Sequence, residues 1–192
     1  MATKMQQAPR TRRLGPPEPE SRIVLPNVSW NECESLVKLW EGRHIRLTYD
    51  RGQLELLTTS CEHERFKTIS GTILTFLAFA LDRGMISAGE MTFRKRFRER
   101  GLEPDDCDWI SNHRRMLGKR DYEHDVDPPP DLVLDIELTS GALNKMSIYA
   151  GLGFPEVWRF DGETLRIHRI GDAENISSSR PVTISRRFLS VS

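Results

Sequence analysis

The chain has few cysteines, no excess of charge of either sign and no long apolar run, and each absence excludes a class of protein. Its three cysteines (Cys33, Cys61 and Cys107) include no C-x-x-C pair, which excludes a disulfide framework or a structural zinc site as the main stabiliser. Basic and acidic residues number 28 each, so no global basicity indicates nucleic-acid binding. The longest apolar run, residues 73–81, is too short to span a bilayer.

A length of 192 residues predicts one domain with a sizeable core. Residues 1–21 carry four prolines and several basic residues with no apolar core behind them, so we expect a flexible tail and no signal peptide. Contact of this tail with nucleic acid is the less favoured alternative. We therefore expect a tail over 1–21 and a single domain over 22–192, in the reducing cytoplasm that the cysteine usage suits.

Hydrophobic periodicity and turn signals predict an α/β domain with a mixed sheet. Helices are expected at 30–41, 61–83 and 144–150, hairpins at 44–57 and 156–170, and further strands at 85–88, 91–97, 107–110 and 131–138. The longest helix repeats apolar side chains at three- and four-residue spacing, which predicts a buried face made of Phe66, Ile69, Ile73, Phe76, Leu77 and Ala80.

The strand predicted over 131–138 carries an unusual pattern of charge. Alternation places Asp135 and Glu137 on one face of the strand, while leucine and isoleucine occupy the other face. Two neighbouring carboxylates on one face of a central strand repel each other and cost desolvation, unless a cation such as a hard divalent metal lies between them. The alternative is an edge strand with a solvated polar face, and the strand alone does not decide between the two.

Other charged residues are ordinary when taken singly. Acidic turns such as 103–105 are usually solvated, and residues such as His63 and Glu64 near a helix start usually lie on the surface. Their order is informative, because a helical Glu precedes two Pro-Asp strand entries and then Lys145. Metal-dependent hydrolysis of a phosphodiester needs these residue types, because carboxylates hold Mg²⁺ and a lysine helps to polarise the attacking water.

Three motifs stand in order along the chain: EPD at 103–105, PPPDLVLDIE at 128–137 and NKMSIYAGLGFPEVW at 144–158. Together they resemble the restriction endonuclease domain family of the PD-(D/E)xK nuclease superfamily, over about residues 30–170. The resemblance implies a restriction-endonuclease-like mixed β-sheet flanked by helices, with an αββαβ core after the N-terminal helix and hairpin. It also implies an Mg²⁺- or Mn²⁺-dependent endonuclease that acts on nucleic acid, DNA above all, and that is often a homodimer.

The resemblance also suggests roles for individual residues. Asp105 and Asp135 match the metal-binding carboxylates, and the backbone carbonyl of Ile136 matches the third protein ligand. Lys145 matches a catalytic lysine that this family carries on the helix after the strand. Glu64 is the helical acid expected to complete the site.

Two positions depart from the family pattern. The family usually has Glu where this chain has Asp135, which shortens the reach of the carboxylate. Glu137 stands where the superfamily motif has its lysine, so the positive charge is expected from Lys145, and Glu137 is expected to bind the metal or a metal-bound water. Asp135→Ala is expected to abolish cleavage and to leave the fold intact, because it relieves repulsion between acids.

Two other functions stay open at this level. The first is a catalytically weak or inactive nucleic-acid-binding relative of the same fold, and the second is a metal-dependent hydrolase of a small phosphorylated or acidic substrate. Basic residues cluster at 94–100 and 113–120, where they would contact a phosphate backbone or simply form a solvated surface. Metal-dependent cleavage separates an enzyme from a binding protein.

Overall fold

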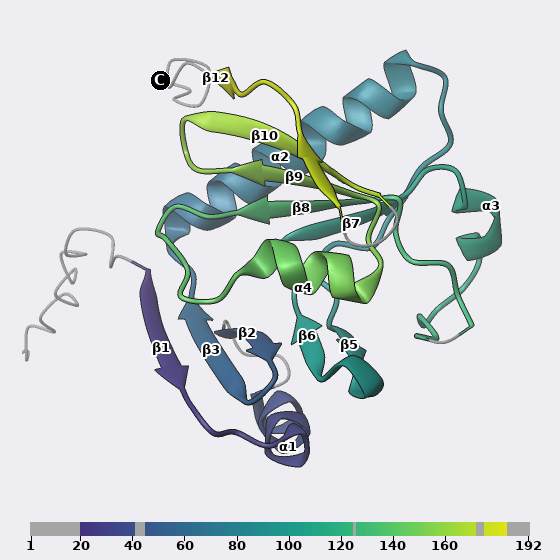
Figure 1. The fold of residues 1–192 in the computed structure, drawn as a ribbon. Helices are drawn as coiled ribbons and strands as arrows, with labels where there is room; N and C mark the ends of the chain where they lie inside the picture. The colour runs from purple at the N-terminus through teal and green to yellow at the C-terminus, as the bar shows by residue number, and fades with distance from the viewer. Residues whose placement is uncertain (1–19, 41–44, 125, 172–174, 184–192) are drawn as a thin grey trace, which may run out of the picture.

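Two β-sheets and the helices around them form the fold (Figure 1). The computed structural model describes residues 20–40, 45–124, 126–171 and 175–183. The helices are α1 (Trp30–Trp40), α2 (Cys61–Ala80), α3 (His113–Met116) and α4 (Lys145–Leu152), with a 3-10 turn, η1 (Arg96–Arg98). The strands are β1 (Ser21–Leu25), β2 (Ile45–Asp50), β3 (Gln53–Thr58), β4 (Ile86–Ser87), β5 (Phe93–Lys95), β6 (Arg100–Leu102), β7 (Asp106–Trp109), β8 (Leu132–Ile136), β9 (Glu156–Phe160), β10 (Thr164–Ile170), β11 (Ile176–Ser178) and β12 (Val182–Thr183).

The first sheet is antiparallel and has the order β1-β3-β2-β6-β5. Its predicted hairpin is confirmed: β2 pairs with β3 around Arg51 and Gly52, which both have positive φ, as a tight hairpin turn requires. Helix α1 covers this sheet through a cluster that includes Trp30 and Leu54. Ser29 and the Glu32 side chain cap the start of α1.

The second sheet is mixed and has the order β11-β10-β9-β8-β7-β4. Of the strand pairs in the described ranges, β8–β9 alone is parallel in this sheet, and α4 provides the crossover between these two strands. All five residues of β8 are buried. The edge-strand alternative is therefore wrong, because β8 lies between β7 and β9 and is covered on both faces.

Each face of the second sheet is covered by one helix. Leu134 and Ile136 pack on Phe66 of α2, while Val133 packs on Ile148 of α4 on the opposite face. Helix α4 also contacts β5 and β6, so it lies between the two sheets (Figure 1). The prediction of one mixed sheet is thus correct for the second sheet and misses that the N-terminal hairpin belongs to a separate sheet.

The predicted apolar face of α2 is buried only in part. Phe66 is 4% exposed, whereas Phe76 is 66% exposed, and Ile73 and Leu77 are exposed as well. Figure 1 shows the reason: the C-terminal half of α2 projects beyond the second sheet. No helix among the described residues is both long and apolar enough to cross a membrane.

The boundary of the predicted tail needs correction at its C-terminal end. Ser21 begins β1 and pairs with Thr58 of β3, and the side chain of Glu20 is 2% exposed. Residues 1–19 lie outside the described residues, so the tail itself stays a prediction. Strand β1 was not predicted because it is short and follows a proline-rich segment, and because its partner strand is more than 30 residues away.

Candidate active site

Asp105 lies in the loop that leads into β7, and donors from three parts of the chain surround its carboxylate. Its backbone N–H donates to the Leu134 carbonyl at 2.9 Å, which holds it beside β8. Oδ2 accepts from the Ile136 N–H at 2.6 Å. Oδ1 lies 2.6 Å from His63 Nε2 and 2.9 Å from Arg46 Nη2. The Pro-Asp strand entry therefore delivers a buried carboxylate into a shell of N–H groups.

His63 is fully buried, and a carboxylate contacts each of its ring nitrogens. Nε2 faces Asp105, and Nδ1 is 2.6 Å from Glu20 Oε1. Ser60 caps α2 by accepting the His63 N–H, which positions the imidazole in the first helical turn. Burial alone would lower the pKa of His63, but hydrogen bonds to Asp105 and Glu20 raise it to about 9. At neutral pH His63 is thus an imidazolium that donates to both acids.

Arg46 brings a second buried cation to Asp105 from β2 of the first sheet. Its guanidinium also pairs with Glu90 and donates to the Pro104 carbonyl at 3.2 Å, and Glu64 Oε1 is 3.8 Å away. Burial acts to lower the pKa of Arg46, but Asp105 and Glu90 raise it above its ordinary value. Arg46 therefore ties the first sheet to the Pro-Asp loop of the second.

Asp135 projects from the centre of β8 toward α4. Lys145 Nζ, in the first turn of α4, donates to Asp135 Oδ1 at 2.7 Å, and Arg159 Nε of β9 is 3.5 Å from Oδ2. Burial opposes ionisation, yet Lys145 and then Arg159 hold the pKa of Asp135 below its ordinary value. Among the described residues Oδ2 has no hydrogen-bond partner. Asp135 is therefore an ionised, buried carboxylate with one oxygen left to bind a further group.

Glu137 lies two residues after Asp135, and Arg159 pairs with both of these acids. The other oxygen of Glu137, Oε1, accepts the Gly141 N–H at 3.1 Å. A cation thus separates the two acids, as the strand pattern required, and it is an arginine of the chain. Tyr149, one helical turn after Lys145, lies beside Asp135, and burial together with this carboxylate raises the pKa of its phenol well above the ordinary value.

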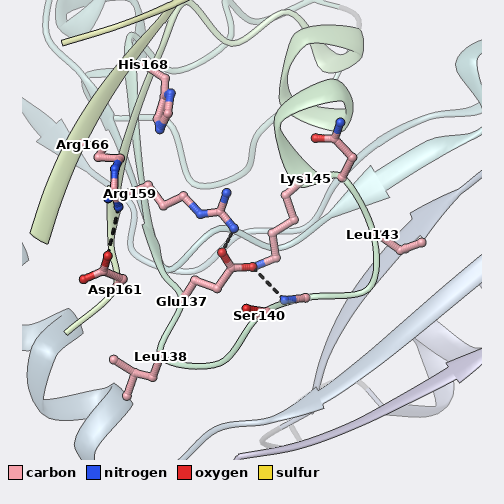
Figure 2. A pocket seen from close by; sticks show the side chains of 11 residues that line it. Glu137, Leu138, Ser140, Leu143, Lys145, Arg159, Asp161, Arg166 and His168 are labelled. Carbon is pink, nitrogen blue, oxygen red and sulfur yellow. Dashed lines mark hydrogen bonds and ion pairs between the residues drawn. The ribbon is translucent and has the colours of Figure 1, made fainter. Parts of the chain in front are cut away.

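A cavity of about 610 Å³ lies beside these acids, a size that accommodates a nucleotide (Figure 2). Its lining comes from the loop after β8, the start of α4, and the strands β9 and β10. In Figure 2, Arg159 extends across the cavity toward Glu137, with Lys145 on one side and Arg166 and His168 on the other. Cationic or nitrogen-bearing side chains from three elements therefore converge on one space.

The loop between β8 and α4 is fastened to the N-terminal segment. Arg22 Nε donates to Thr139 Oγ1 at 3.0 Å, and Thr139 Oγ1 in turn donates to Glu20 Oε2 at 2.7 Å. Glu55 of β3 accepts the Ala142 N–H at 2.7 Å. Because Glu20 also contacts His63, it links this loop, which lines the cavity, to the cation that faces Asp105.

The structure brings most of the predicted site residues together and leaves one aside. Asp105 accepts the backbone N–H of Ile136, and Asp135 accepts from Lys145. Glu64 is partly exposed and pairs with Lys67 at 2.5 Å, while its neighbour His63 points at Asp105. The catalytic role of Glu64 stays a prediction, and Arg46, which pairs with both acids, links Glu64 to Asp105.

Arg46, Arg159 and Tyr149 were missed by sequence reasoning. A signal for Arg46 existed, since a lone arginine on an otherwise buried strand of a hairpin must find an acid. Arg159 in EVWRF gave the same signal, but its partnership with Asp135 depends on the register of the parallel strands. Tyr149 stands four residues after Lys145, and this spacing alone indicates no role for it.

The donor set at the site fits a hard divalent cation. Asp135 Oδ2 is the observation that carries this, since it accepts no hydrogen bond among the described residues and the Arg159 guanidinium stands 3.5 Å away, which leaves the oxygen able to bind a metal ion. The described residues contain no cluster of three or more His, Cys, Asp or Glu side chains that could hold a metal by themselves. Such a sparse set suits Mg²⁺, which protein sites often bind through one or two carboxylates and substrate phosphates. Roles for Ile136 and Glu137 as ligands stay predictions, and both Glu137 oxygens are occupied here.

The expectation that Asp135→Ala leaves the fold intact by relieving repulsion between acids is wrong in its reason. Asp135 forms a buried ion pair with Lys145, so its removal would leave an unpaired buried ammonium rather than relieve repulsion. An Asp135→Asn substitution keeps the shape and a hydrogen-bond acceptor for Lys145. It is therefore the better test of the carboxylate.

A family model described as "Putative restriction endonuclease", Uma2, matches residues 30–190 of the chain. The match covers well over half of the 192 residues and includes all of the motifs discussed above. No curated protein matches the chain.

Proposed function

The chain belongs to the Uma2 family of restriction-endonuclease-like proteins, and on that premise we propose that it is an Mg²⁺- or Mn²⁺-dependent endonuclease that hydrolyses phosphodiester bonds of DNA. One observation carries this proposal. Asp135 is 1% exposed, stays ionised beside Lys145, and keeps one oxygen without a hydrogen-bond partner among the described residues. A folded protein rarely keeps a buried, ionised carboxylate with an oxygen that accepts no hydrogen bond unless it has a use for it.

Asp105, at the entry to β7, and Asp135, on the adjacent strand β8, would hold the metal. When bound, the ion would stabilise negative charge on the phosphate and lower the pKa of an attacking water. The proposed cofactor is Mg²⁺, with Mn²⁺ as its substitute, because both accept carboxylate oxygens.

The chain itself supplies positive charge and orientation. Lys145 is held against Asp135 by the first turn of α4, so its ammonium stands ready to polarise water or contact a phosphate oxygen. His63 and Arg46 both contact Oδ1 of Asp105, and these two contacts preorganise the carboxylate. Tyr149 stays a neutral phenol at physiological pH and can donate to Asp135.

Supercoiled plasmid provides the direct test. Wild type, Asp135→Asn and the control Asp108→Asn are incubated with the plasmid in Mg²⁺, in Mn²⁺ and in EDTA. Asp108 is an equally buried aspartate on the neighbouring strand β7, so the control makes the same chemical change away from the cavity. We expect wild type and Asp108→Asn to nick or linearise the plasmid only with metal, and Asp135→Asn to be slower by at least about 10³-fold.

The same experiment separates the second candidate function from the first. Retarded plasmid without cleavage in any metal would identify a catalytically inactive DNA-binding relative. Equal cleavage by wild type and Asp135→Asn would contradict the assignment of the carboxylate. Cleavage that persists in EDTA would contradict the requirement for metal.

The basic residues of the segment 94–100 support a DNA partner, with one exception. Arg100 is buried and is held by Asp50 at 3.1 Å and by the Ser147 carbonyl at 2.9 Å, so it joins β6 to α4. Arg96 and Arg98 are exposed, and Arg94 is half-buried. Neutralising Arg94, Arg96 and Arg98 together should weaken DNA binding for all sequences and flatten its salt dependence. Binding unchanged at low salt would exclude these arginines from the contact surface.

We also propose a homodimer that buries the projecting half of α2. Ile73, Phe76 and Phe79 leave a run of apolar surface there that water solvates poorly. Phe76→Glu should convert a dimer to a monomer in light scattering. A monomeric wild type would contradict the proposal.

The location proposed for the protein is the cytoplasm, which its three free thiols suit.

A further inference from the structure

A row of charge runs across three strands of the second sheet. Asp135 of β8 is the register partner of Arg159 of β9, and Arg159 is in turn the register partner of Arg166 of β10. Side chains of register partners point to the same face of a sheet. Asp135 is the buried end of this row, and the two arginines line the wall of the cavity (Figure 2).

Two arginines directly opposite each other are an unfavourable pair unless anions lie near them. Arg159 is held by Asp135 and Glu137 on its inner side, and Arg166 Nη1 is 2.9 Å from Asp161 Oδ2 on its outer side. These acids pull the two guanidinium groups apart rather than bridge them. Arg166 remains 46% exposed, so its side chain is able to turn toward an anion that enters the cavity.

His168 adds a hydrogen-bonding group to the same wall. It lies two residues after Arg166 on β10, and therefore on the same face of the strand. Nδ1 is 2.8 Å from Ser178 Oγ, while Nε2 is buried and has no partner among the described residues. When the Ser178 hydroxyl donates to Nδ1, Nε2 carries the ring proton and becomes a donor without an acceptor.

An anion is the ligand that satisfies all three side chains. Burial and the nearby charges of Arg159 and Arg166 lower the pKa of His168, so its ring is neutral at physiological pH and supplies a single N–H. A phosphate group offers several acceptor oxygens and matches the planar fork of arginine. The cavity volume of about 610 Å³ leaves room for a phosphate together with its sugar.

We propose that Arg159, Arg166 and His168 form a binding site for a DNA phosphate next to the one that is cleaved. This inference rests on the proposed function, and it adds a second contact on the β9–β10 wall to the chemistry at Asp135. The wall would hold the backbone in register with Lys145 and carry no information about base sequence.

The test measures DNA binding without cleavage. Fluorescence anisotropy of a fluorescein-labelled 20-base-pair duplex is recorded in EDTA over a series of salt concentrations, for Arg166→Gln, His168→Gln and Arg169→Gln. Arg169 is the matched control, because it directly follows His168 on β10 and points to the opposite face, where it pairs with Glu156. Circular dichroism melting confirms that each variant is folded.

The two cavity variants should differ in a characteristic way. Arg166→Gln should weaken binding about tenfold and reduce the slope of log K against log salt by about 1, since one phosphate contact is lost. His168→Gln should weaken binding several-fold with an unchanged slope, because the ring is neutral. Arg169→Gln should change neither quantity. Equal effects of Arg166→Gln and Arg169→Gln, or no effect of either, would overturn the phosphate site.

Failure of this inference is distinguishable from failure of the proposed function. Metal-dependent plasmid cleavage together with unchanged binding by Arg166→Gln leaves the nuclease and removes the phosphate site. The expected binding pattern without any cleavage leaves the site and removes the nuclease. A wild type that neither binds the duplex nor cleaves plasmid removes both.

Discussion

Asp135 and Asp108 are buried to the same extent, 1% exposed each, on neighbouring strands of one sheet, yet their surroundings are opposite in kind. Asp135 faces α4, where Lys145 and Arg159 keep its pKa low. Asp108 points to the other face, and burial and then the charge of Asp106 raise its pKa to about 7. Neither Asp108 oxygen has a hydrogen-bond partner among the described residues.

The difference shows what distinguishes a candidate site from a merely buried acid. Burial alone drives a carboxylate toward its neutral form, so an ionised buried carboxylate has to be maintained by cations. Within the described part of the chain, two cations lie at Asp135 and none lies against Asp108 to hold it ionised. Four variants test this contrast.

Lys145→Met should have the largest effect, because it removes the main cation at Asp135. Turnover on plasmid should fall by roughly 10² or more, the scale of a positioned catalytic group. Breaking the buried pair should also cost about 3–5 kcal/mol in the free energy of unfolding, measured by urea denaturation. Near-normal turnover in a folded variant would show that Lys145 is not the catalytic lysine.

Asp108→Asn should act in the opposite direction on stability. A folded-state pKa raised from 3.8 to about 7 costs the wild type stability progressively as pH rises from about 4 to 7, up to about 4 kcal/mol. The variant lacks this loss, so its advantage in urea denaturation should grow over that pH range and then level off. A constant difference between pH 4 and pH 8 would mean that Asp108 ionises normally.

His63→Gln should reveal a second pH range with the sign reversed. The folded-state pKa of His63 is raised from 6.5 to about 9, so its stabilising contribution is complete below about pH 6.5 and is lost as pH rises through 9. The wild type should exceed the variant by about 3 kcal/mol more at pH 6 than at pH 10. A gap independent of pH would show that the ring is neutral between Glu20 and Asp105.

Tyr149→Phe should have the smallest effect. The phenol stays neutral and only assists Lys145 and Arg159 in stabilising the Asp135 charge. We expect turnover to fall less than tenfold, with the same metal requirement in the plasmid assay. A loss as large as that of Lys145→Met would identify the phenol as a group that takes part directly in the reaction.

Much of the fold could be predicted because its signals are local. The hairpin at Arg51-Gly52, the cap at Ser29 and the alternation around Asp135 are each written within a few residues. The apolar face of α2 was predicted to be buried throughout, but its C-terminal half is exposed. Periodicity shows that a helix face is apolar, and it does not show what covers that face. β1 was missed since its partner β3 is distant in sequence.

For the candidate site, the amino-acid sequence by itself determined which side chains are available: the Pro-Asp entry at Asp105, the acidic strand at Asp135 and Lys145 at the start of the next helix. Only the tertiary structure decided their partners. Arg46 extends from the first sheet to contact Asp105 at the entry to β7 of the second, and Arg159 meets Asp135 through the register of parallel strands. The physical reason is that a charge is recognisable from its residue type, whereas its pKa and its use depend on desolvation and on cations brought near by distant segments.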